Sequence, residues 1–236
     1  MDIEICVEKL ETVLAAEQLG AKRVELCSAL DLGGLTPSLG MVESCIAQSN
    51  LDVFVMIRPR GGGFVYAEKE IAIMKRDIQL AANHGANGVV FGCLQKNGLM
   101  DVKNNRVLLE EAKSLKLGVT LHRAIDRCRQ PEKGIEQLIN WGFDRILTSG
   151  QKKTAIEGVD KIAYWTGLFG QKIEIMAGSG VNALNAKLLL ASGVNALHFT
   201  ARKKIKQKSS FNMGPMYEVD EDKIKEVIAV LKNKKV

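Results

Sequence analysis

The sequence of 236 residues lacks the features that define several large classes of protein. It has no run of roughly 20 apolar residues, which a membrane-spanning helix needs, and its opening, MDIEICVEKLE, is too acidic for a secretory signal. Its five cysteines are odd in number and contain no C-x-x-C pair, which argues against a disulfide framework or a zinc ribbon. We therefore expect a cytoplasmic protein that has no membrane partner.

The excess of positive charge is confined to two short segments. The chain has a net charge of +6, but residues 202–208 carry five positive charges and the tail KNKKV carries three more. These eight charges exceed the total, so the rest of the chain is slightly acidic, at −2. Because a nucleic-acid-binding face needs a broad basic stripe, we interpret both segments as solvated and expect no nucleic-acid partner.

Eight short segments rich in β-branched and aliphatic residues recur along the chain, separated by amphipathic helical stretches. The eight segments are 3–7, 23–27, 53–59, 88–92, 118–122, 145–149, 173–178 and 196–200. Strict alternation of this kind predicts a parallel sheet, and eight units fit a closed (β/α)₈ TIM barrel. An open doubly wound sheet is the alternative, although no G-x-G-x-x-G follows the first segment. No break in composition marks a second domain, so we expect one TIM-barrel domain over 1–236. That domain would include a basic loop at about 202–220 and a C-terminal helix.

The alternation of side chains along each strand predicts which residues enter the barrel. In the first strand Ile3, Ile5 and Val7 share one face, whereas Glu4 and Cys6 share the other. The outer helices need apolar partners, so the aliphatic face must look outward. The same rule places further residues inside: Glu25, Cys27, Met56, Arg58, Thr120, His122, Glu174, Met176, His198 and Thr200.

This interior is unusually polar, and a buried charge costs several kcal/mol unless it is paired. Active sites of TIM barrels lie at the C-terminal ends of the strands, so we interpret the polar residues as a functional cluster at that mouth. The alternative is an ion network of Glu4 and Glu25 with Arg58 that only stabilises the barrel.

Two glycine-rich segments are suited to binding an anion. Three consecutive glycines follow the third strand and are flanked by Arg58 and Arg60, and such a loop can wrap an anion. Loops after the last two strands bind phosphate in many barrels, which points to residues 178–180 and to Thr200. The predicted anion-binding residues are Arg58, Arg60, Gly178, Ser179, Gly180 and Thr200.

The fifth strand ends in LHRAID and supplies a candidate acid–base pair. His122 is on the inward face, and Asp126 is close enough in sequence to orient it. Glu4 and Glu25 are the candidate second carboxylates. These four residues are the predicted catalytic group if the protein is an enzyme.

Cys6 and Cys27 occupy similar inward positions near the ends of two adjacent strands. Neighbouring strands lie about 5 Å apart, so both sulfurs could reach one soft ion, and two thiolates suit Cu(I). Two small buried apolar residues would be the ordinary alternative.

Six ordered motifs resemble the CutC copper homeostasis protein family: ELCSALDLGGLTPS, MIRPRGGGFVY, GVVFG, TLHRAID, RILTSG and MAGSGV. The resemblance runs from Met1 to about Thr200. It implies a cytoplasmic, often oligomeric (β/α)₈ barrel that handles copper, with Cys6 and Cys27 as ligands and with no assigned reaction. Gly63 and Ile125 depart from the family pattern, which commonly has an acidic residue and an aromatic residue there.

Two functions follow as hypotheses. The first is a homo-oligomeric copper homeostasis protein that binds Cu(I) through Cys6 and Cys27. The second is a lyase-type or isomerase-type TIM-barrel enzyme that acts on a small anionic or phosphorylated metabolite, with His122, Asp126 and the interior carboxylates as acid–base groups.

Overall fold

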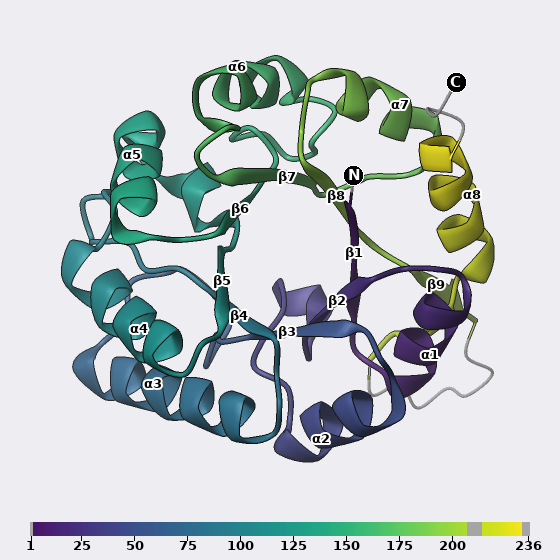
Figure 1. Ribbon diagram of the computed structural model, residues 1–236, viewed down its shortest axis with the longest axis horizontal. Coiled ribbons are helices and arrows are strands. Elements are labelled where there is room, and N and C mark those ends of the chain that lie inside the picture. Colours follow the sequence, from purple (N-terminus) through teal and green to yellow (C-terminus); the bar gives the residue numbers. More distant parts are fainter. Residues whose placement is uncertain (1, 207–213, 233–236) are drawn as a thin grey trace.

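The computed structural model describes residues 2–206 and 214–232, and its centre is a closed barrel of eight parallel strands (Figure 1). Each strand pairs with the next along the chain, and β8 pairs with β1 to close the ring. The strands are β1 (Asp2–Val7), β2 (Arg23–Leu26), β3 (Asp52–Met56), β4 (Gly88–Phe91), β5 (Gly118–Leu121), β6 (Arg145–Thr148), β7 (Glu174–Gly178) and β8 (Ala196–Thr200). The (β/α)₈ prediction is therefore confirmed, and the open sheet is excluded.

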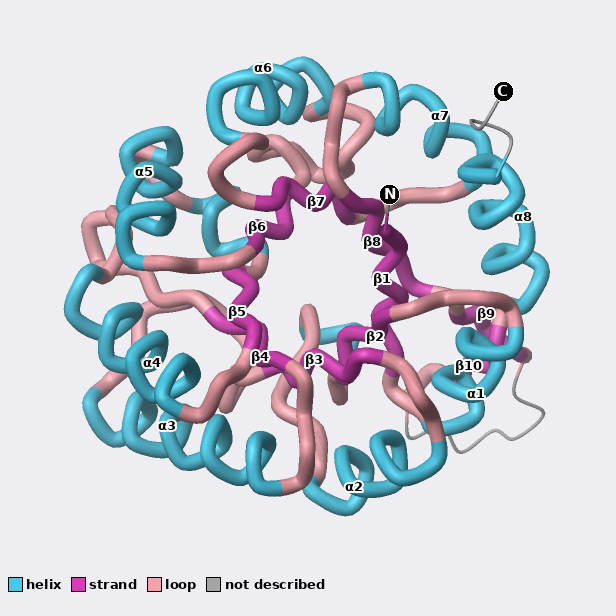
Figure 2. The backbone as a smooth tube through the Cα atoms, viewed as in Figure 1, coloured by secondary structure: helices cyan, strands magenta, loops and turns pink. Residues whose placement is uncertain are grey.

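The helices form an outer ring around this barrel (Figure 2). They are α1 (Leu10–Gln18), α2 (Leu39–Gln48), α3 (Glu68–Asn83), α4 (Val102–Ser114), α5 (Pro131–Trp141), α6 (Val159–Phe169), α7 (Ala183–Ala191) and α8 (Glu221–Lys232), with short 3₁₀ turns η1 (Leu30–Leu32) and η2 (Arg123–Arg127). α5 ends at Gly142, whose φ of 94° allows the chain to turn back into the sheet. No helix in the described ranges is both long and apolar enough to cross a membrane.

The main apolar core lies between the barrel and the helices. The outward residues Ile3, Ile5 and Val7 of β1 belong to it, together with Val24 and Leu26 of β2. Smaller apolar clusters fill parts of the interior, one around Phe54 and Met56 and another around Met176. The predicted alternation is thus confirmed: the aliphatic face packs against the helices and the polar face enters the barrel.

The basic segment after β8 is partly a strand rather than a loop. β9 (Arg202–Ile205) pairs antiparallel with β10 (Met216–Val219), and these two strands lie beside α1 (Figure 2). Arg202 is not simply solvated, because its guanidinium pairs with Glu8 at 3.1 Å and Asp31 at 2.8 Å. Residues 207–213 of the predicted basic loop and 233–236 of the basic tail lie outside the described residues.

Candidate functional site

A cavity of about 340 Å³ opens at the C-terminal ends of the barrel strands. Its walls are formed by the ends of strands and by the loops that follow β2, β3, β5 and β7. The lining residues with polar or sulfur atoms are Cys6, Glu25, Met56, Arg58, His122, Arg123, Ser179, His198, Thr200, Arg202 and Lys223. Of the residues expected inside the barrel, Cys6, Glu25, Met56, Arg58, His122, His198 and Thr200 line this cavity, whereas Glu4, Cys27, Thr120, Glu174 and Met176 do not.

Cys6 and Cys27 are neighbours at one edge of this cavity, with their Sγ atoms 3.7 Å apart. The register of the two strands places Cys6 beside Glu25, so Cys27 stands one inward position closer to the mouth than Cys6. The loop after β2 covers Cys27, since a Cβ atom at Gly34 would lie 3.2 Å from its Sγ. Cys6 lines the cavity, and Cys27 is buried behind the wall.

The surroundings of both thiols favour the protonated form. A hydrogen bond with Cys27, together with burial, raises the pKa of Cys6 well above its ordinary value. Burial raises the pKa of Cys27 to about 12, and the negative charge of Glu25 acts in the same direction. Oε2 of Glu25 accepts a hydrogen bond from the Cys27 thiol at 3.5 Å. Both residues are therefore thiols near neutral pH.

His198 lies between two buried carboxyl groups. Its Nδ1 is 2.9 Å from Oε1 of Glu4, and its Nε2 is 3.5 Å from Oε2 of Glu25. Burial opposes a charged imidazole, but the charge of Glu25 and the hydrogen bonds with Cys6 and Glu4 outweigh it and raise the pKa of His198 well above its ordinary value. The imidazole is therefore charged at neutral pH, and it links Glu4 of β1 with Glu25 of β2.

The two carboxyl groups beside His198 differ in acidity. Burial tends to raise the pKa of Glu4, but His198 and two nearby arginines bring it below its ordinary value. For Glu25, burial and the charge of Glu4 outweigh His198, so its pKa is raised. Glu4 is thus a fixed anion, and Glu25 is the carboxyl group that is easier to protonate.

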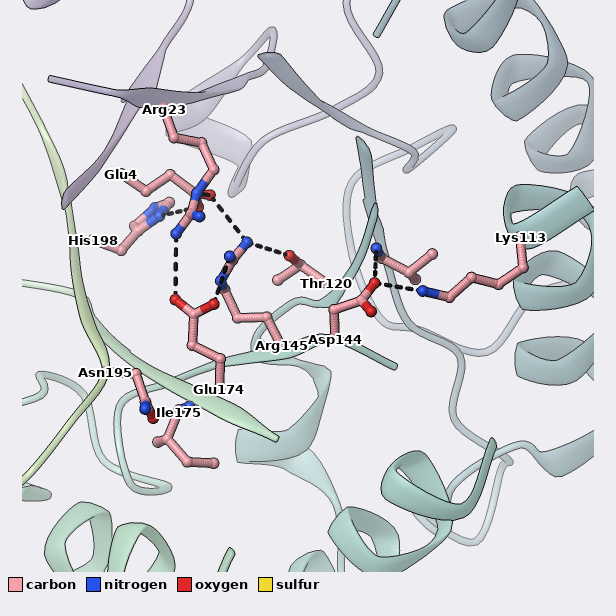
Figure 3. A network of polar contacts seen from close by, with 11 residues as sticks. Glu4, Arg23, Lys113, Thr120, Asp144, Arg145, Glu174, Ile175, Asn195 and His198 are labelled. Carbon is pink, nitrogen blue, oxygen red and sulfur yellow. Dashed lines mark hydrogen bonds and ion pairs between the residues drawn. The ribbon is translucent and has the colours of Figure 1, made fainter. Parts of the chain in front are cut away.

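The side chains of two arginines pair with Glu4 inside the barrel, toward the N-terminal ends of the strands (Figure 3). Nε of Arg23 is 2.7 Å and Nη1 of Arg145 is 3.8 Å from Oε2 of Glu4. Both guanidinium groups also pair with Glu174, at 3.4 and 2.6 Å, and both lie over the ring of Phe54. This ion network stabilises the part of the barrel interior that lies on the N-terminal side of the cavity.

Arg23 and Arg145 were not expected from the sequence as partners of Glu4. The expected ion network of Glu4 and Glu25 with Arg58 does not form, because the two arginines of β2 and β6 pair with Glu4 instead. A signal was available, since alternation along β2 places Arg23 on the same face as Glu25. The choice of partner depends on the register of β1 and β2, which sets Glu4 beside Arg23.

Arg58 and Arg60 diverge although they are two residues apart. Arg58 is 4% exposed and lines the cavity, and its guanidinium donates to the carbonyl oxygens of Leu32, Gly34 and Gly62. Arg60 pairs with Glu70 and donates to carbonyl groups of its own loop, and it is not part of the cavity wall. The structure thus places only Arg58 of the two where a ligand in the cavity can reach it.

Asp126 does not orient His122. Both of its carboxylate oxygens accept hydrogen bonds from the turn after β6, including those from Thr148 Oγ1 at 2.6 Å and Gln151 N at 3.1 Å, and it also pairs with Arg123. The 3₁₀ turn η2 carries Asp126 away from the imidazole and toward β6. His122 instead accepts a hydrogen bond at Nδ1 from the Ala124 N–H at 3.2 Å.

His122 is an uncharged imidazole in the cavity wall. Burial and the nearby charge of Arg58 lower its pKa to about 3. Its ring lies against that of Phe64, with 4.6 Å between the centroids. A histidine with this pKa does not exchange protons near neutral pH, so the structure gives no support to its expected role as a general acid or base.

The predicted anion-binding residues 178–180 and Thr200 do not all lie in the cavity wall. Ser179, Gly180 and Thr200 line the cavity. Gly178 instead lies inside the barrel, where a Cβ atom would be 2.5 Å from Leu147 and 3.3 Å from His198. Its lack of a side chain makes room for these residues. Arg202 and Lys223 line the cavity as well, although both follow the eighth strand and were not among the expected site residues.

Two groups of side chains bring three potential metal ligands within 4.8 Å of one another: Cys6, Glu25 and Cys27, and Glu4, Glu25 and His198. In the second group, salt bridges already occupy Glu4 and His198. The first group contains two sulfurs and one oxygen and suits a soft ion. Cys6, Glu25 and Cys27 are therefore the candidate metal ligands.

Comparisons with known proteins agree on one family. The model of the CutC family matches residues 1–203. A CutC family protein of Vibrio cholerae is 45% identical over 201 residues, which cover 85% of this chain and 79% of that protein. A CutC family protein of Pasteurella multocida is 43% identical, over 86% of this chain and 82% of that one.

A solved structure gives the same result at the level of the fold. The crystal structure of a Streptococcus agalactiae protein, provisionally described as the copper homeostasis protein CutC, is 34% identical and has a TM-score of 0.79. The match covers 84% of this chain and 98% of that one. Sequence and structure together show that the chain belongs to the CutC family.

Proposed function

We propose that the protein is a cytoplasmic copper-handling protein that binds Cu(I) through Cys6 and Cys27. The observation that carries this proposal is the separation of 3.7 Å between the two Sγ atoms. All five cysteines are free, which is typical of a reducing compartment. The Streptococcus agalactiae relative is itself provisionally described as a copper homeostasis protein.

The geometry of the thiol pair suits one small ion. Two sulfurs bound at about 2.3 Å to a tetrahedral ion lie about 3.8 Å apart, close to the observed separation. Glu25 provides an oxygen next to the pair, since its Oε2 is 3.5 Å from Cys27 Sγ. The site therefore needs little rearrangement to hold an ion between Cys6 and Cys27.

The acidity of the two cysteines sets the condition for binding. Both thiols have raised pKa values, so an ion that binds to them must displace their protons. A soft ion such as Cu(I) forms strong bonds with thiolates and is the kind of ion that can drive this exchange. A hard ion such as Mg²⁺ prefers oxygen ligands and gains little from the sulfurs.

An anaerobic Cu(I) titration in competition with a chromophoric chelator tests the proposal. We expect the Cys6→Ser/Cys27→Ser variant to lose the high-affinity Cu(I) of the wild type. The matched control is Cys45→Ala/Cys128→Ala, which alters two buried cysteines away from the cavity and should bind as the wild type does. Equal Cu(I) affinity in the wild type and the Cys6/Cys27 variant would overturn the proposal.

We infer a second candidate function from the size of the cavity. A volume of about 340 Å³ is far larger than one ion requires and lies within the range of small-molecule sites. Five basic side chains line it, namely Arg58, Arg123, His198, Arg202 and Lys223, against the single lining carboxyl group of Glu25. Arg123, His198 and Arg202 are paired with acidic residues, whereas Arg58 forms no ion pair with a described carboxylate. This balance favours a small anionic metabolite as substrate of an isomerase-type or lyase-type enzyme.

Within this second function, Glu25 is the residue that we propose for acid–base work. It lines the cavity, and its Oε1 has no hydrogen-bond partner among the described residues. A thermal-shift screen of small anionic metabolites tests the function. Stabilisation of the wild type but not of Arg58→Ala supports it, and a screen without any stabilising anion would contradict it.

A further inference from the structure

Three buried hydrogen-bond donors around the third-strand loop lack an acceptor. Nε of Arg58, Nε2 of His122 and Oη of Tyr66 have no hydrogen-bond partner within 2–206 and 214–232. Arg58 and His122 both line the cavity, with Phe64 in contact with each of them. Because buried polar groups are nearly always paired in native proteins, an unpaired set of this kind indicates a missing acceptor.

Arg58 is a buried cation without a counter-ion. Its three hydrogen bonds all go to backbone carbonyl oxygens, and it forms no ion pair with any described carboxylate. These bonds use three of its five N–H groups, and the Nε–H has no acceptor among the described residues. A buried charge without a partner is costly, so the site is built for a negative group beside Arg58.

The second donor is the Nε2–H of His122. Nδ1 accepts a hydrogen bond from the Ala124 N–H and therefore carries no proton itself. With a pKa of about 3 the ring is neutral at pH 7, so its one proton is on Nε2. His122 thus offers an uncharged donor on the edge of the ring opposite the backbone.

Tyr66 adds a third donor close to the same guanidinium. Burial raises the pKa of its phenol to about 12, so the hydroxyl keeps its proton, and the charge of Arg58 is near enough to act on it. Tyr66 is not part of the cavity wall, so it supports the region around Arg58 rather than the ligand itself. Arg58 and His122 therefore supply one positive charge and one neutral donor in the cavity wall.

We infer that the cavity binds a small monocarboxylic acid whose carboxylate lies between the guanidinium of Arg58 and the Nε2–H of His122. This inference rests on the second candidate function and names its ligand class. A carboxylate accepts several hydrogen bonds and carries one charge, which Arg58 alone balances. A phosphate dianion at the same position would have a second charge that neither Arg58 nor the neutral His122 balances. His122 is accordingly a binding residue.

The test is a titration of the whole protein with sodium pyruvate, sodium propionate and inorganic phosphate at constant ionic strength. Binding is followed by NMR through the Nε–H of Arg58 and the Nε2–H of His122, which is one of only three histidines. We expect both signals to shift with pyruvate and with propionate along one saturation curve, and to shift little with phosphate.

Two substitutions at position 122 separate the donor from its surroundings. His122→Asn keeps an acceptor near Nδ1 but removes the donor, and should weaken pyruvate binding about tenfold or more, the usual effect of one hydrogen bond to a charged group. His122→Gln retains an N–H near Nε2 and should stay within about threefold of the wild type. Arg58→Gln should abolish binding, whereas Arg60→Gln, on the same loop but away from the cavity, should bind normally.

The possible failures are distinguishable. If phosphate saturates the site and the carboxylates do not, the ligand class is wrong and the anion site stands. If none of the three anions binds to the wild type, this inference fails, and the thermal-shift screen decides the second candidate function separately. Equal pyruvate affinity of His122→Asn and the wild type would remove His122 from the site, and this comparison remains decisive even if Arg58→Gln does not fold.

Discussion

The Nδ1 atom of His198 lies 2.9 Å from Oε1 of Glu4, so a buried hydrogen bond joins the first strand to the last strand of the barrel. Glu4 also forms salt bridges with Arg23 and Arg145, which come from two other strands. One fully buried carboxylate on β1 therefore balances charges that come from three other strands. Glu4 lies on the N-terminal side of the cavity, and its hydrogen bond fixes the position of His198 in the cavity wall.

Replacing Glu4 should destabilise the barrel strongly. Glu4→Gln leaves two arginines and a charged histidine with one carboxylate fewer, and we expect a loss of about 3 kcal/mol or more in the free energy of unfolding. Glu174→Gln is the matched control, because Glu174 pairs with the same arginines but is 24% exposed. Urea unfolding followed by circular dichroism measures both variants. Equal losses would show that burial of Glu4 is not what makes it important.

Gly88 should not tolerate a side chain. A Cβ atom there would lie 2.3 Å from the ring of Phe54 and 2.7 Å from the carbonyl oxygen of Gly118. Since neither the ring nor the backbone can move away easily, we expect Gly88→Ala to cost about 3 kcal/mol. Gly167→Ala, in helix α6 with open space around it, should be neutral or stabilise the protein by up to about 1 kcal/mol. Thermal unfolding of the two variants compares these effects, and a harmless Gly88→Ala would contradict the packing described for Phe54.

His122 should make the protein less stable in acid. Its pKa in the folded protein, about 3, lies below the value of 6.5 expected for an unfolded chain, so the unfolded state takes up the proton first as the pH falls. Its contribution to stability is therefore complete above pH 6.5 and is lost toward pH 3. Between pH 6.5 and 4.5 we expect this residue alone to remove about 2 kcal/mol.

The contribution of His122 is isolated by comparing wild type with His122→Gln in urea at several pH values. Other acidic groups contribute to both proteins and cancel in the difference. The wild type should lose stability more steeply with acid than the variant does. Parallel pH profiles would mean that His122 is not held uncharged in the folded protein.

Asp126 should prove to be structural. It accepts hydrogen bonds from Thr148, Ser149 and Gln151, so Asp126→Asn should cost about 2 kcal/mol of stability through the turn after β6. The exposed Asp160→Asn serves as a control without such partners and should change little. Pyruvate binding should fall less in Asp126→Asn than in His122→Asn. A larger fall would restore the orienting role that the sequence suggested for Asp126.

The sequence alone was sufficient to predict the barrel and the face of each strand. The periodicity of apolar residues predicts the alternation of strands and helices, and each strand has only two faces on which a side chain can lie. For this reason Glu4, Cys6 and Glu25 could be placed inside from the pattern of β1 and β2. The resemblance of six motifs also identified the CutC family, which the comparisons confirm.

The sequence did not determine which polar residues meet. Arg23 rather than Arg58 reaches Glu4 because of the register between β1 and β2, and a register is a property of two strands together. Asp126 lies close to His122 in sequence but turns toward β6, because the hydrogen bonds of that turn hold both of its oxygens. Lys223 reaches the cavity from a helix that follows the barrel.

The sequence by itself therefore determined the barrel, the inward set of residues and the closeness of Cys6 to Cys27. Only the tertiary structure decided that His122 is a neutral donor, that Arg58 lacks a counter-ion and that Arg60 is turned away. The physical reason is that the alternation of side chains along a strand is a local property of the sequence. The burial of a side chain and its choice of polar partner depend on segments that are far apart in the chain. A pKa or an unpaired donor depends on all of these neighbours at once.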